Sequence, residues 1–437
     1  MPLFPLPSYA VPWSRGAIVL ALTLSAAFAR PAPQMSWIEN EFVRVGVDLN
    51  LGGAITSIVE KEDGRELVNS YDLGREIQMS FYGGPTPFEP DGKKAHPQWR
   101  NLGWNPIQSG DWSGNPSKVL EHRNGADELF TRSIPMQWPL EGVPGDCQFE
   151  SRIRLEGRAI ILRCKLINQR KDQTFYPAKH QELPAVYANG AFSKVTTYSG
   201  DRPFTSGALS EWIEPGPPWR NFHATEHWAA LVDSQNRGLG VWQPDTTSWI
   251  GGTVVGNPAK QGPLDNATAY VAPITLEHLD PQGTLEYETR LVAGTVPQIR
   301  ALVLQWESER GLPHSLMKHD RAGWSLRGGR DSGTPFPGMW KIEASGGALV
   351  LVGPTTFWRA EKGGRLRLRG RVRSGSQKGG RLQIVWKSLH PAGKEEGAPF
   401  EWHPHTELGQ TAFDLGSKPG YTGGMVQLTL RFEGLVP

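Results

Sequence analysis

The chain has 437 residues, of which 38% are hydrophobic and 21% charged, proportions typical of a folded globular protein rather than a disordered one. Its formal net charge of +2 excludes a global electrostatic attraction to nucleic acid or to membrane surfaces. The length indicates two domains, and 51 glycines with 36 prolines favour many turns over long helices, so an all-β architecture is predicted.

The first 29 residues have the pattern of a secretory signal peptide. Arg15 precedes an apolar run over residues 17–28, which closes on the small-residue cleavage pattern Ala27-Phe28-Ala29. The run is too short for a membrane span, and no later segment reaches the length of about 18 apolar residues that a span needs. We therefore expect a secreted or periplasmic protein, cleaved near Ala29 and without a membrane span.

An antiparallel hairpin opens the first predicted domain. Residues 42–48 alternate between apolar and polar side chains, Gly52-Gly53 turns the chain, and residues 54–60 continue as a second strand.

A tryptophan-rich segment, WRNLGWNPIQSGDW, follows with three tryptophans in fourteen residues. Indole rings set among Gly, Pro, Asn and Asp offer flat apolar faces with a polar edge, which suit sugar rings. The alternative is that these tryptophans pack beneath a long loop as a satellite cluster. The predicted substrate-binding residues here are Trp99, Trp104, Asn105, Gln108 and Trp112. Asp111 is predicted as a catalytic carboxylate or, alternatively, as part of an Asx-type turn.

Two strands are predicted between the cysteines of the chain, Cys147 and Cys164. A hairpin that pairs Leu155 with Arg158 places Cys147 opposite Leu166, so the two thiols share a face but lie diagonally. A disulfide would then need a register shift or a bulge, and both the bonded and the free state stay open.

The segment KHQELPAVY contains the first candidate for acid–base chemistry. His180 and Glu182 alternate along a predicted strand and therefore project from one face. Glu182 is predicted as general acid or base, His180 as its proton partner or a hydroxyl ligand, and Tyr187 as a substrate-binding residue. The alternative is that His180 and Glu182 lie on a solvated sheet face.

The segment FHATEHW matches the H-x-x-E-H spelling of inverted zinc metallopeptidases. The strand, turn and strand predicted after it leave no helix to bring both histidines to one face, so we reject that match. His223 and Glu226 are predicted as catalytic, with Arg220 and His227 as substrate-binding residues. No metal is predicted, although a site built from His180, Glu182, His223 and His227 remains an alternative.

Further strands and one helix complete the first domain, which is expected over residues 36–310. The strands are predicted over residues 129–138, 147–155, 159–168, 228–233, 239–243, 267–279 and 284–293. Thr295 can cap a helix with Pro297 in its first turn, and apolar residues follow at helical spacing.

A boundary near residues 311–323 precedes a second domain over residues 324–437, with strands predicted at 340–344, 348–352, 365–373, 381–387 and 425–432. Within it, RLRLRGRVR alternates arginines with Leu366, Leu368 and Val372, a half-buried strand with a basic outer face. The arginines are Arg365, Arg367, Arg369, Arg371 and Arg373. That face can hold an acidic polysaccharide, or it is solvated and paired with acidic neighbours.

The opening segment NEFVRVGVDLNLGGAITSIVEKEDGRELVN resembles the first hairpin of galactose-mutarotase-like β-supersandwich proteins. The resemblance implies a large antiparallel β-supersandwich over about residues 36–310, with a concave sheet face that holds saccharides. Members of that fold group include epimerases, domains of polysaccharide lyases and accessory domains of glycoside hydrolases. The C-terminal part looks like a carbohydrate-binding β-sandwich module.

Together these patterns predict a secreted carbohydrate-active enzyme that cleaves a polysaccharide or oligosaccharide by hydrolysis or β-elimination. A hydrolase would need two carboxylates. A lyase would use a base and a group that neutralises a uronate, with Tyr187, His180, Asn105 and Arg220 as candidates. The alternatives are a non-catalytic glycan-binding protein or a sugar epimerase. No P-loop or dinucleotide fingerprint is present, so no cofactor is predicted. The small net charge likewise predicts no nucleic-acid partner.

Overall fold

The computed structural model describes residues 32–257, 259–317, 320–372, 380–391, 393–403 and 405–435. The predicted signal peptide lies outside the described residues. The described part of the chain is mostly β with one α-helix, as predicted, and none of its helices is long and apolar enough to cross a membrane.

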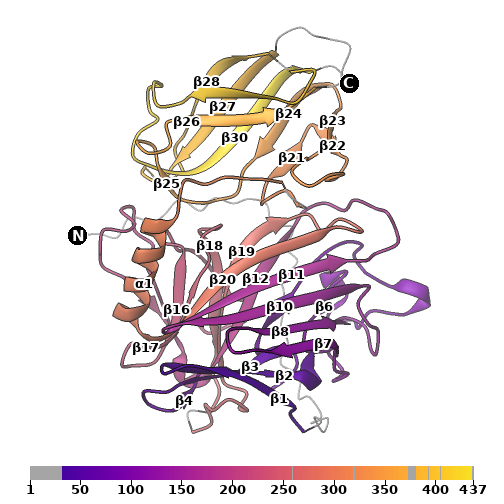
Figure 1. The fold of residues 1–437 in the computed structure, drawn as a ribbon, viewed down its shortest axis with the longest axis vertical. Coiled ribbons are helices and arrows are strands. Elements are labelled where there is room, and N and C mark those ends of the chain that lie inside the picture. The colour runs from indigo at the N-terminus through magenta and orange to yellow at the C-terminus, as the bar shows by residue number, and fades with distance from the viewer. Residues whose placement is uncertain are drawn as a thin grey trace.

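An eleven-stranded antiparallel sheet forms one layer of the N-terminal part of the chain (Figure 1). Its main order is β1-β2-β3-β5-β12-β19-β18-β15, with β4, β6 and β9 attached at the side. The strands are β1 (Met35–Glu39), β2 (Val43–Asp48), β3 (Ala54–Glu60), β4 (Arg65–Glu66), β5 (Ile77–Ser80), β6 (Pro106–Ile107), β9 (Met136–Gln137), β12 (Lys179–Asn189), β15 (Arg220–His223), β18 (Ser248–Val254) and β19 (Thr268–Glu277).

A nine-stranded sheet packs against it in the order β14-β13-β16-β17-β20-β11-β10-β8-β7. Its strands are β7 (Lys118–Asn124), β8 (Leu129–Ile134), β10 (Cys147–Glu156), β11 (Ala159–Asn168), β13 (Lys194–Thr197), β14 (Ser210–Trp212), β16 (Trp228–Val232), β17 (Arg237–Trp242) and β20 (Thr284–Thr295). Short 3-10 turns connect some strands: η1 (Leu49–Leu51), η2 (Pro90–Gly92), η3 (Arg100–Leu102) and η4 (Gly190–Phe192).

The main hydrophobic core fills the space between these two sheets, because alternate side chains of each strand point inward. The predicted helix is α1 (Val296–Glu309), and it covers the other face of the nine-stranded sheet through Ile299, Val303 and Trp306. Thr295 caps its first turn and Gln298 completes a capping box, as the sequence pattern predicted for Thr295.

The predicted opening hairpin is confirmed as β2 and β3, but the predicted register of the cysteine hairpin is wrong. Glu156 pairs with Ala159, so Cys147 lies opposite Asn168, two residues from the expected partner. The turn begins at Gly157 with φ 56°, as a two-residue turn with glycine first requires. Both cysteines are free and buried, and burial raises the pKa of the Cys164 thiol to about 12.

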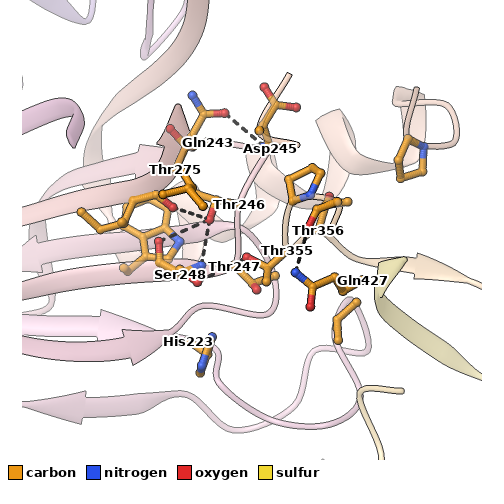
Figure 2. A pocket seen from close by; sticks show the side chains of 18 of the residues that line it. His223, Gln243, Asp245, Thr246, Thr247, Ser248, Thr275, Thr355, Thr356 and Gln427 are labelled. Atoms are coloured by element: carbon orange, nitrogen blue, oxygen red, sulfur yellow. Dashed lines mark hydrogen bonds between the residues drawn. The ribbon is translucent and has the colours of Figure 1, made fainter. Parts of the chain in front are cut away.

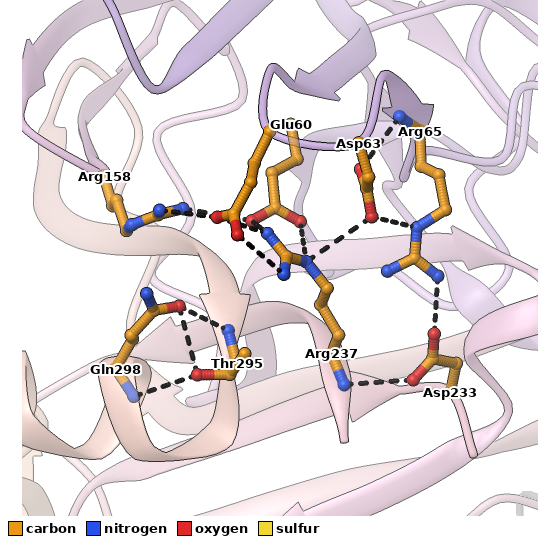
Figure 3. Close-up of polar contacts among 9 residues, drawn as sticks. Glu60, Asp63, Arg65, Arg158, Asp233, Arg237, Thr295 and Gln298 are labelled. Carbon is orange, nitrogen blue, oxygen red and sulfur yellow. Dashed lines mark hydrogen bonds and ion pairs between the residues drawn. The ribbon is translucent and has the colours of Figure 1, made fainter. Parts of the chain in front are cut away.

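A buried charge network ties the turns at one end of the two sheets together (Figure 3). Glu60, which is fully buried, accepts hydrogen bonds from Arg158 at 3.0 Å and from Arg237 at 2.6 Å. Arg65 pairs with Asp233 on the same side. Because each buried carboxylate has a cationic partner, the ion pairs offset part of the desolvation cost and connect the three turns to one another.

Smaller sheets form the C-terminal part, which lies at the other end of the N-terminal sheets (Figure 1). One sheet has the order β21-β24-β30-β27-β28 with β25 attached, and β22-β23 and β26-β29 form two strand pairs. The strands are β21 (Ser325–Arg327), β22 (Gly329–Asp331), β23 (Ile342–Ala344), β24 (Gly347–Val352), β25 (Trp358–Arg359), β26 (Arg365–Gly370), β27 (Gly380–Ser388), β28 (Glu395–Trp402), β29 (Gly409–Asp414) and β30 (Gly424–Leu435). They enclose their own core around Leu382, Trp386 and Phe413.

Candidate functional site

A cleft of about 1740 Å³ separates the N-terminal sheets from the C-terminal sheets. Its N-terminal wall includes His180, His223 and the polar turn from Thr246 to Ser248, and its C-terminal wall includes Thr355 and Gln427. Figure 2 shows the Thr246–Ser248 turn on one side and Thr355 with Gln427 on the other. Hydroxyl and amide groups from both parts of the chain therefore face one space.

Direct bonds across the base of the cleft hold the two parts together. The Thr247 amide donates to the Thr355 carbonyl at 3.0 Å, and the Thr356 hydroxyl donates to the Pro244 carbonyl at 3.2 Å. The Gly323 amide donates to the Glu277 carboxyl at 3.3 Å. The cleft is therefore bounded by hydrogen-bonded backbone on both walls.

The outer face of the eleven-stranded sheet opens into this cleft. We use this name for the face that points away from the main core, where Tyr187, Tyr270 and Ile274 form a separate small cluster. Ile274 belongs to this face and also lines the cleft, as does His180. One continuous surface therefore runs from the middle of the sheet to the C-terminal domain.

The strand register brings Glu182 and His223 into one row across the outer face. Glu182 pairs with Ile274 and His223 pairs with Ser248, and the pairing of β18 with β19 makes Ser248 and Ile274 neighbours. His180 precedes Glu182 by two residues on β12, so both point to this face, as predicted. Three strand spacings separate β12 from β15, roughly 14 Å, so Glu182 and His223 do not touch and instead bound an extended surface.

Glu182 is a half-buried carboxyl among tyrosines. Tyr82 donates a hydrogen bond from its hydroxyl to Glu182 Oε2 at 3.3 Å. Burial raises the pKa of Glu182, and the hydroxyls of Tyr270 and Tyr82 oppose part of the shift. A carboxyl that keeps its proton above the usual range can act as a general acid at mildly acidic pH.

Three stacked aromatic rings lie beside this carboxyl. The Tyr187 and Tyr270 ring centroids are 4.6 Å apart, and Trp219 stacks on Tyr270 at 5.2 Å. Tyr187 and Tyr270 are buried, whereas Trp219 is half-buried and ends the stack toward solvent. The stack therefore presents one indole as its accessible end.

The two histidines of the cleft wall remain accessible to solvent. The surrounding protein partly buries the rings of His180 and His223, and this burial lowers the pKa of each. Both side chains are therefore largely neutral near pH 7 and can accept or donate hydrogen bonds to hydroxyl groups.

The tryptophan-rich segment packs away from this surface. Trp104 is fully buried and donates from its indole nitrogen to Asp146 at 2.6 Å, and Trp99 packs edge-on against Trp138. Trp112 is half-buried against His96. This placement agrees with the alternative that these tryptophans pack beneath a long loop as a satellite cluster.

The polar side chains of the same segment form hydrogen bonds with backbone groups of the fold. Asn105 donates to the Phe81 carbonyl at 2.8 Å, and Gln108 accepts from the Met79 amide at 3.2 Å. Asp111 is buried and accepts hydrogen bonds from the backbone amides of Ser113, Asn115 and Gly142, the arrangement of the Asx-turn alternative. None of these three side chains lines the cleft described above.

Glu226 and His227 lie inside the fold, on neither the outer face nor the cleft wall. Glu226 is fully buried and accepts from Arg300 at 2.8 Å and from the Trp228 indole at 3.1 Å. His227 is also fully buried, with Nδ1 at 2.7 Å from Glu307. The strand, turn and strand predicted after this segment are confirmed as β16 and β17. Within the segment, a turn at Thr225 and Glu226 that was not predicted separates His223 from His227.

Arg220 is exposed on the cleft wall and stacks its guanidinium over Trp212 at 4.7 Å. Among the residues that the structure describes, no group of three or more His, Cys, Asp and Glu side chains is arranged to hold a metal ion.

Four residues of this region were not predicted. Tyr82, Tyr270 and Trp219 lie around Glu182 on the outer face, whereas Glu277 lines the cleft from the opposite face of β19. Tyr82 reaches Glu182 only because β5 pairs with β12, across 100 residues of sequence. Alternation along β19 did carry a signal for Tyr270 and Glu277, since it places them on opposite faces.

Comparison with protein-family models and with curated proteins gave no match. The chain is similar to a galactose mutarotase-like protein from Lactobacillus casei, at 13% identity over 59% of this chain and 99% of that one, with a TM-score of 0.37. It is similar to a galactose mutarotase related enzyme from Lactobacillus acidophilus, at 11% identity over 59% of this chain and 97% of that one, with a TM-score of 0.37. A 4-alpha-glucanotransferase from Thermococcus litoralis gives 11% identity, 60% and 40% coverage and a TM-score of 0.32. At these values no activity, substrate or residue role is transferred to this chain.

Proposed function

We propose that this protein is a secreted carbohydrate-active enzyme that holds an oligosaccharide or polysaccharide on the outer face of the eleven-stranded sheet. In this proposal the saccharide chain enters the cleft, and Glu182 as general acid gives its proton to the glycosidic oxygen as the C–O bond to that oxygen breaks. The observation on which the proposal rests is a carboxyl with a raised pKa beside an aromatic stack on an open sheet face.

The aromatic stack supports a saccharide ligand. The C–H faces of a sugar ring pack on an indole, while its hydroxyls need hydrogen-bond partners at the ring edge. Trp219 supplies the accessible aromatic end. His180, His223 and Ser248 supply neutral donors and acceptors along the same surface.

The extent of the surface supports a bound oligosaccharide or polysaccharide rather than a single sugar. The row from Glu182 to His223 crosses four strands and continues along the polar wall of the cleft. A saccharide bound along this row would contact several sites, each of modest strength.

Glu182 supports acid–base chemistry more directly than its neighbours do. Tyr82 and Tyr270 lie beside it, and burial raises the pKa of each hydroxyl, so both stay protonated near pH 7 and do not act as bases there. Of these three groups, Glu182 is therefore the one that ionises at the lowest pH, and its raised pKa lets it keep a proton above the usual range of a glutamate.

Incubation of the purified protein with neutral and acidic polysaccharides tests the proposal. Reducing ends would be followed together with ultraviolet absorbance from unsaturated uronates. Growth of absorbance would indicate β-elimination, and reducing ends without absorbance would indicate hydrolysis. If neither signal grows but the protein is retained on one immobilised glycan, the protein would be a non-catalytic glycan-binding protein and not an enzyme.

The variant Glu182→Gln then tests the assigned residue. We expect kcat to fall by roughly 10²- to 10⁴-fold with little change in KM, because the amide keeps the shape but not the proton. Glu309→Gln, at the exposed end of α1, is the matched control and should keep the wild-type rate. A wild-type rate in Glu182→Gln would remove Glu182 from the mechanism.

A further inference from the structure

The outer face of β26 carries a row of exposed arginines. Arg365, Arg367 and Arg369 alternate with Leu366 and Leu368, and the leucines pack on the C-terminal core while the arginines point to solvent. The predicted two-faced strand is thus confirmed over β26. Arg371 follows as an exposed residue just beyond the strand, and Arg373 lies outside the described residues.

These arginines have no protein partner within the described residues. The side chains of Arg365, Arg367 and Arg369 form no ion pair, hydrogen bond or ring contact there. Arginines on the nine-stranded sheet differ, since Arg154 and Arg163 each pair with a glutamate at 2.9 and 2.6 Å. The row on β26 therefore differs from the glutamate-paired arginines of the nine-stranded sheet.

The neighbouring strand does not neutralise the row. β29 places Asp414 opposite Arg365, Ala412 opposite Arg367 and Gln410 opposite Arg369. One carboxylate therefore faces three guanidinium groups, and it lies at one end of the row without forming an ion pair to Arg365.

We propose that this arginine face binds an anionic polysaccharide through its carboxylate or sulfate groups. Alternate residues of a strand are about 6.7 Å apart, so the three guanidinium groups form a line of about 13 Å. A guanidinium matches a carboxylate or sulfate with two parallel hydrogen bonds, and a regular polymer can repeat that match along the line. The choice of a saccharide as the polymer rests on the proposed function.

The side chains around the row favour a saccharide over single-stranded nucleic acid. Proteins that hold single strands combine cations with aromatic rings on which bases stack. The exposed residues of β29 beside the arginines are Gln410, Ala412 and Asp414, and none is aromatic.

The arginine face and the cleft lie on opposite sides of the C-terminal sheets. The cleft is lined by Val350, Lys387 and Thr429, which point outward from the sheet of β24, β27 and β30. The inner face of that sheet packs on the core shared with Leu366 and Leu368. The arginine face therefore acts as an anchor for the polymer and not as part of the cleavage site.

Binding of the full chain to immobilised polysaccharides tests the proposal. The probes are polygalacturonate for carboxylates, dextran sulfate for sulfates, unmodified dextran as the neutral control and single-stranded DNA. The variant Arg365→Gln/Arg367→Gln/Arg369→Gln should bind polygalacturonate or dextran sulfate about 10- to 100-fold more weakly than wild type at low salt, because three exposed charge contacts are lost. The probe that shows the loss identifies the anion.

The matched control is Arg123→Gln/Arg154→Gln/Arg163→Gln, which removes the same charge from exposed, glutamate-paired arginines of the other domain. It should keep its affinity for both anionic polymers. An equal loss of affinity in both variants would mean that binding depends only on the net charge of the protein, and it would overturn the proposal. Tighter wild-type binding to DNA than to either polysaccharide would also overturn it.

Charged residues on a short edge strand also prevent association between sheets, and the same variants separate that role. If the arginines only protect the edge, the β26 variant would self-associate and keep its affinity, which would overturn the proposal. Failure of the proposed function can be told apart from failure of this proposal. A protein that cleaves no polysaccharide can still bind anionic polymers, and only its β26 variant would then bind them more weakly.

Discussion

Glu277 ends β19 on the side that faces the core, where the residue is only 6% exposed. Burial, together with the charges of Asp320 and Asp245, raises the pKa of Glu277 to about 8. An unfolded glutamate ionises near pH 4.5. The native state therefore holds a proton that the unfolded chain releases, and the free energy of unfolding falls as pH rises from about 4.5 to about 8, by up to about 1.4 kcal/mol per pH unit.

We expect Glu277→Gln to remove this pH dependence. The amide cannot ionise, so the variant should gain stability relative to wild type as pH rises through that window, by a few kcal/mol in total. Urea unfolding of both proteins at pH 5 and pH 8.5 measures the difference. A difference that is the same at both pH values would show that Glu277 titrates normally.

At the scale of elements, the tryptophan-rich segment is a structural part of the N-terminal sheets, because Trp104 fills the core beside the edge strands β6 and β9. We expect Trp104→Ala to lower the free energy of unfolding by about 3–5 kcal/mol, since it removes a buried ring and leaves Asp146 without its donor. Trp112→Ala should cost less, because Trp112 is half-buried. Denaturant unfolding gives both values, and saccharide binding by the folded fraction should be unchanged. Lost binding without lost stability would restore the ligand-binding interpretation of the segment.

The elements themselves were largely predictable, because periodicity and capping are local. The Thr295 cap and the alternation along β2, β3 and β26 lie within short windows of sequence. The register of β10 and β11 was missed by two residues, since the turn could be placed either at Glu156-Gly157 or, as found, one residue later. Glycine at the first turn position was the signal for the second choice.

The candidate site was predictable only in part, because its members meet through strand pairing. His180 and Glu182 are two residues apart on β12, so the alternation of side chains along a strand is enough to predict that they share a face. Tyr82 and Tyr270, which contact Glu182, lie about 90 to 100 residues away in the sequence, and no local pattern links them to it. The tryptophans among Gly, Pro and Asn suggested a ligand-binding surface. The same composition is also typical of a long loop whose tryptophans pack inward, which is what the structure has.

At the scale of the whole molecule, one buried histidine joins the two parts of the chain. The Phe357 amide, from the C-terminal part, donates to His227 Nε2 at 3.2 Å, so the ring proton lies on Nδ1, which donates to Glu307 of α1 at 2.7 Å. His227 thus connects the helix, the nine-stranded sheet and the C-terminal sheets through a single ring. The bonds across the cleft base add to this connection.

We expect His227→Ala to separate the unfolding of the two parts. The substitution leaves the Phe357 amide unpaired and removes one partner of Glu307 in the interior, a loss of about 2–5 kcal/mol that falls on the junction. Differential scanning calorimetry should show one transition for wild type and two for the variant, with the C-terminal part melting first because its core is smaller. His122→Ala is the control, since His122 bonds Ser36 far from the junction, and it should keep a single transition. A single transition at lower temperature in His227→Ala would mean that the remaining contacts across the cleft suffice to couple the two parts, and the cleft would then keep its shape without the histidine.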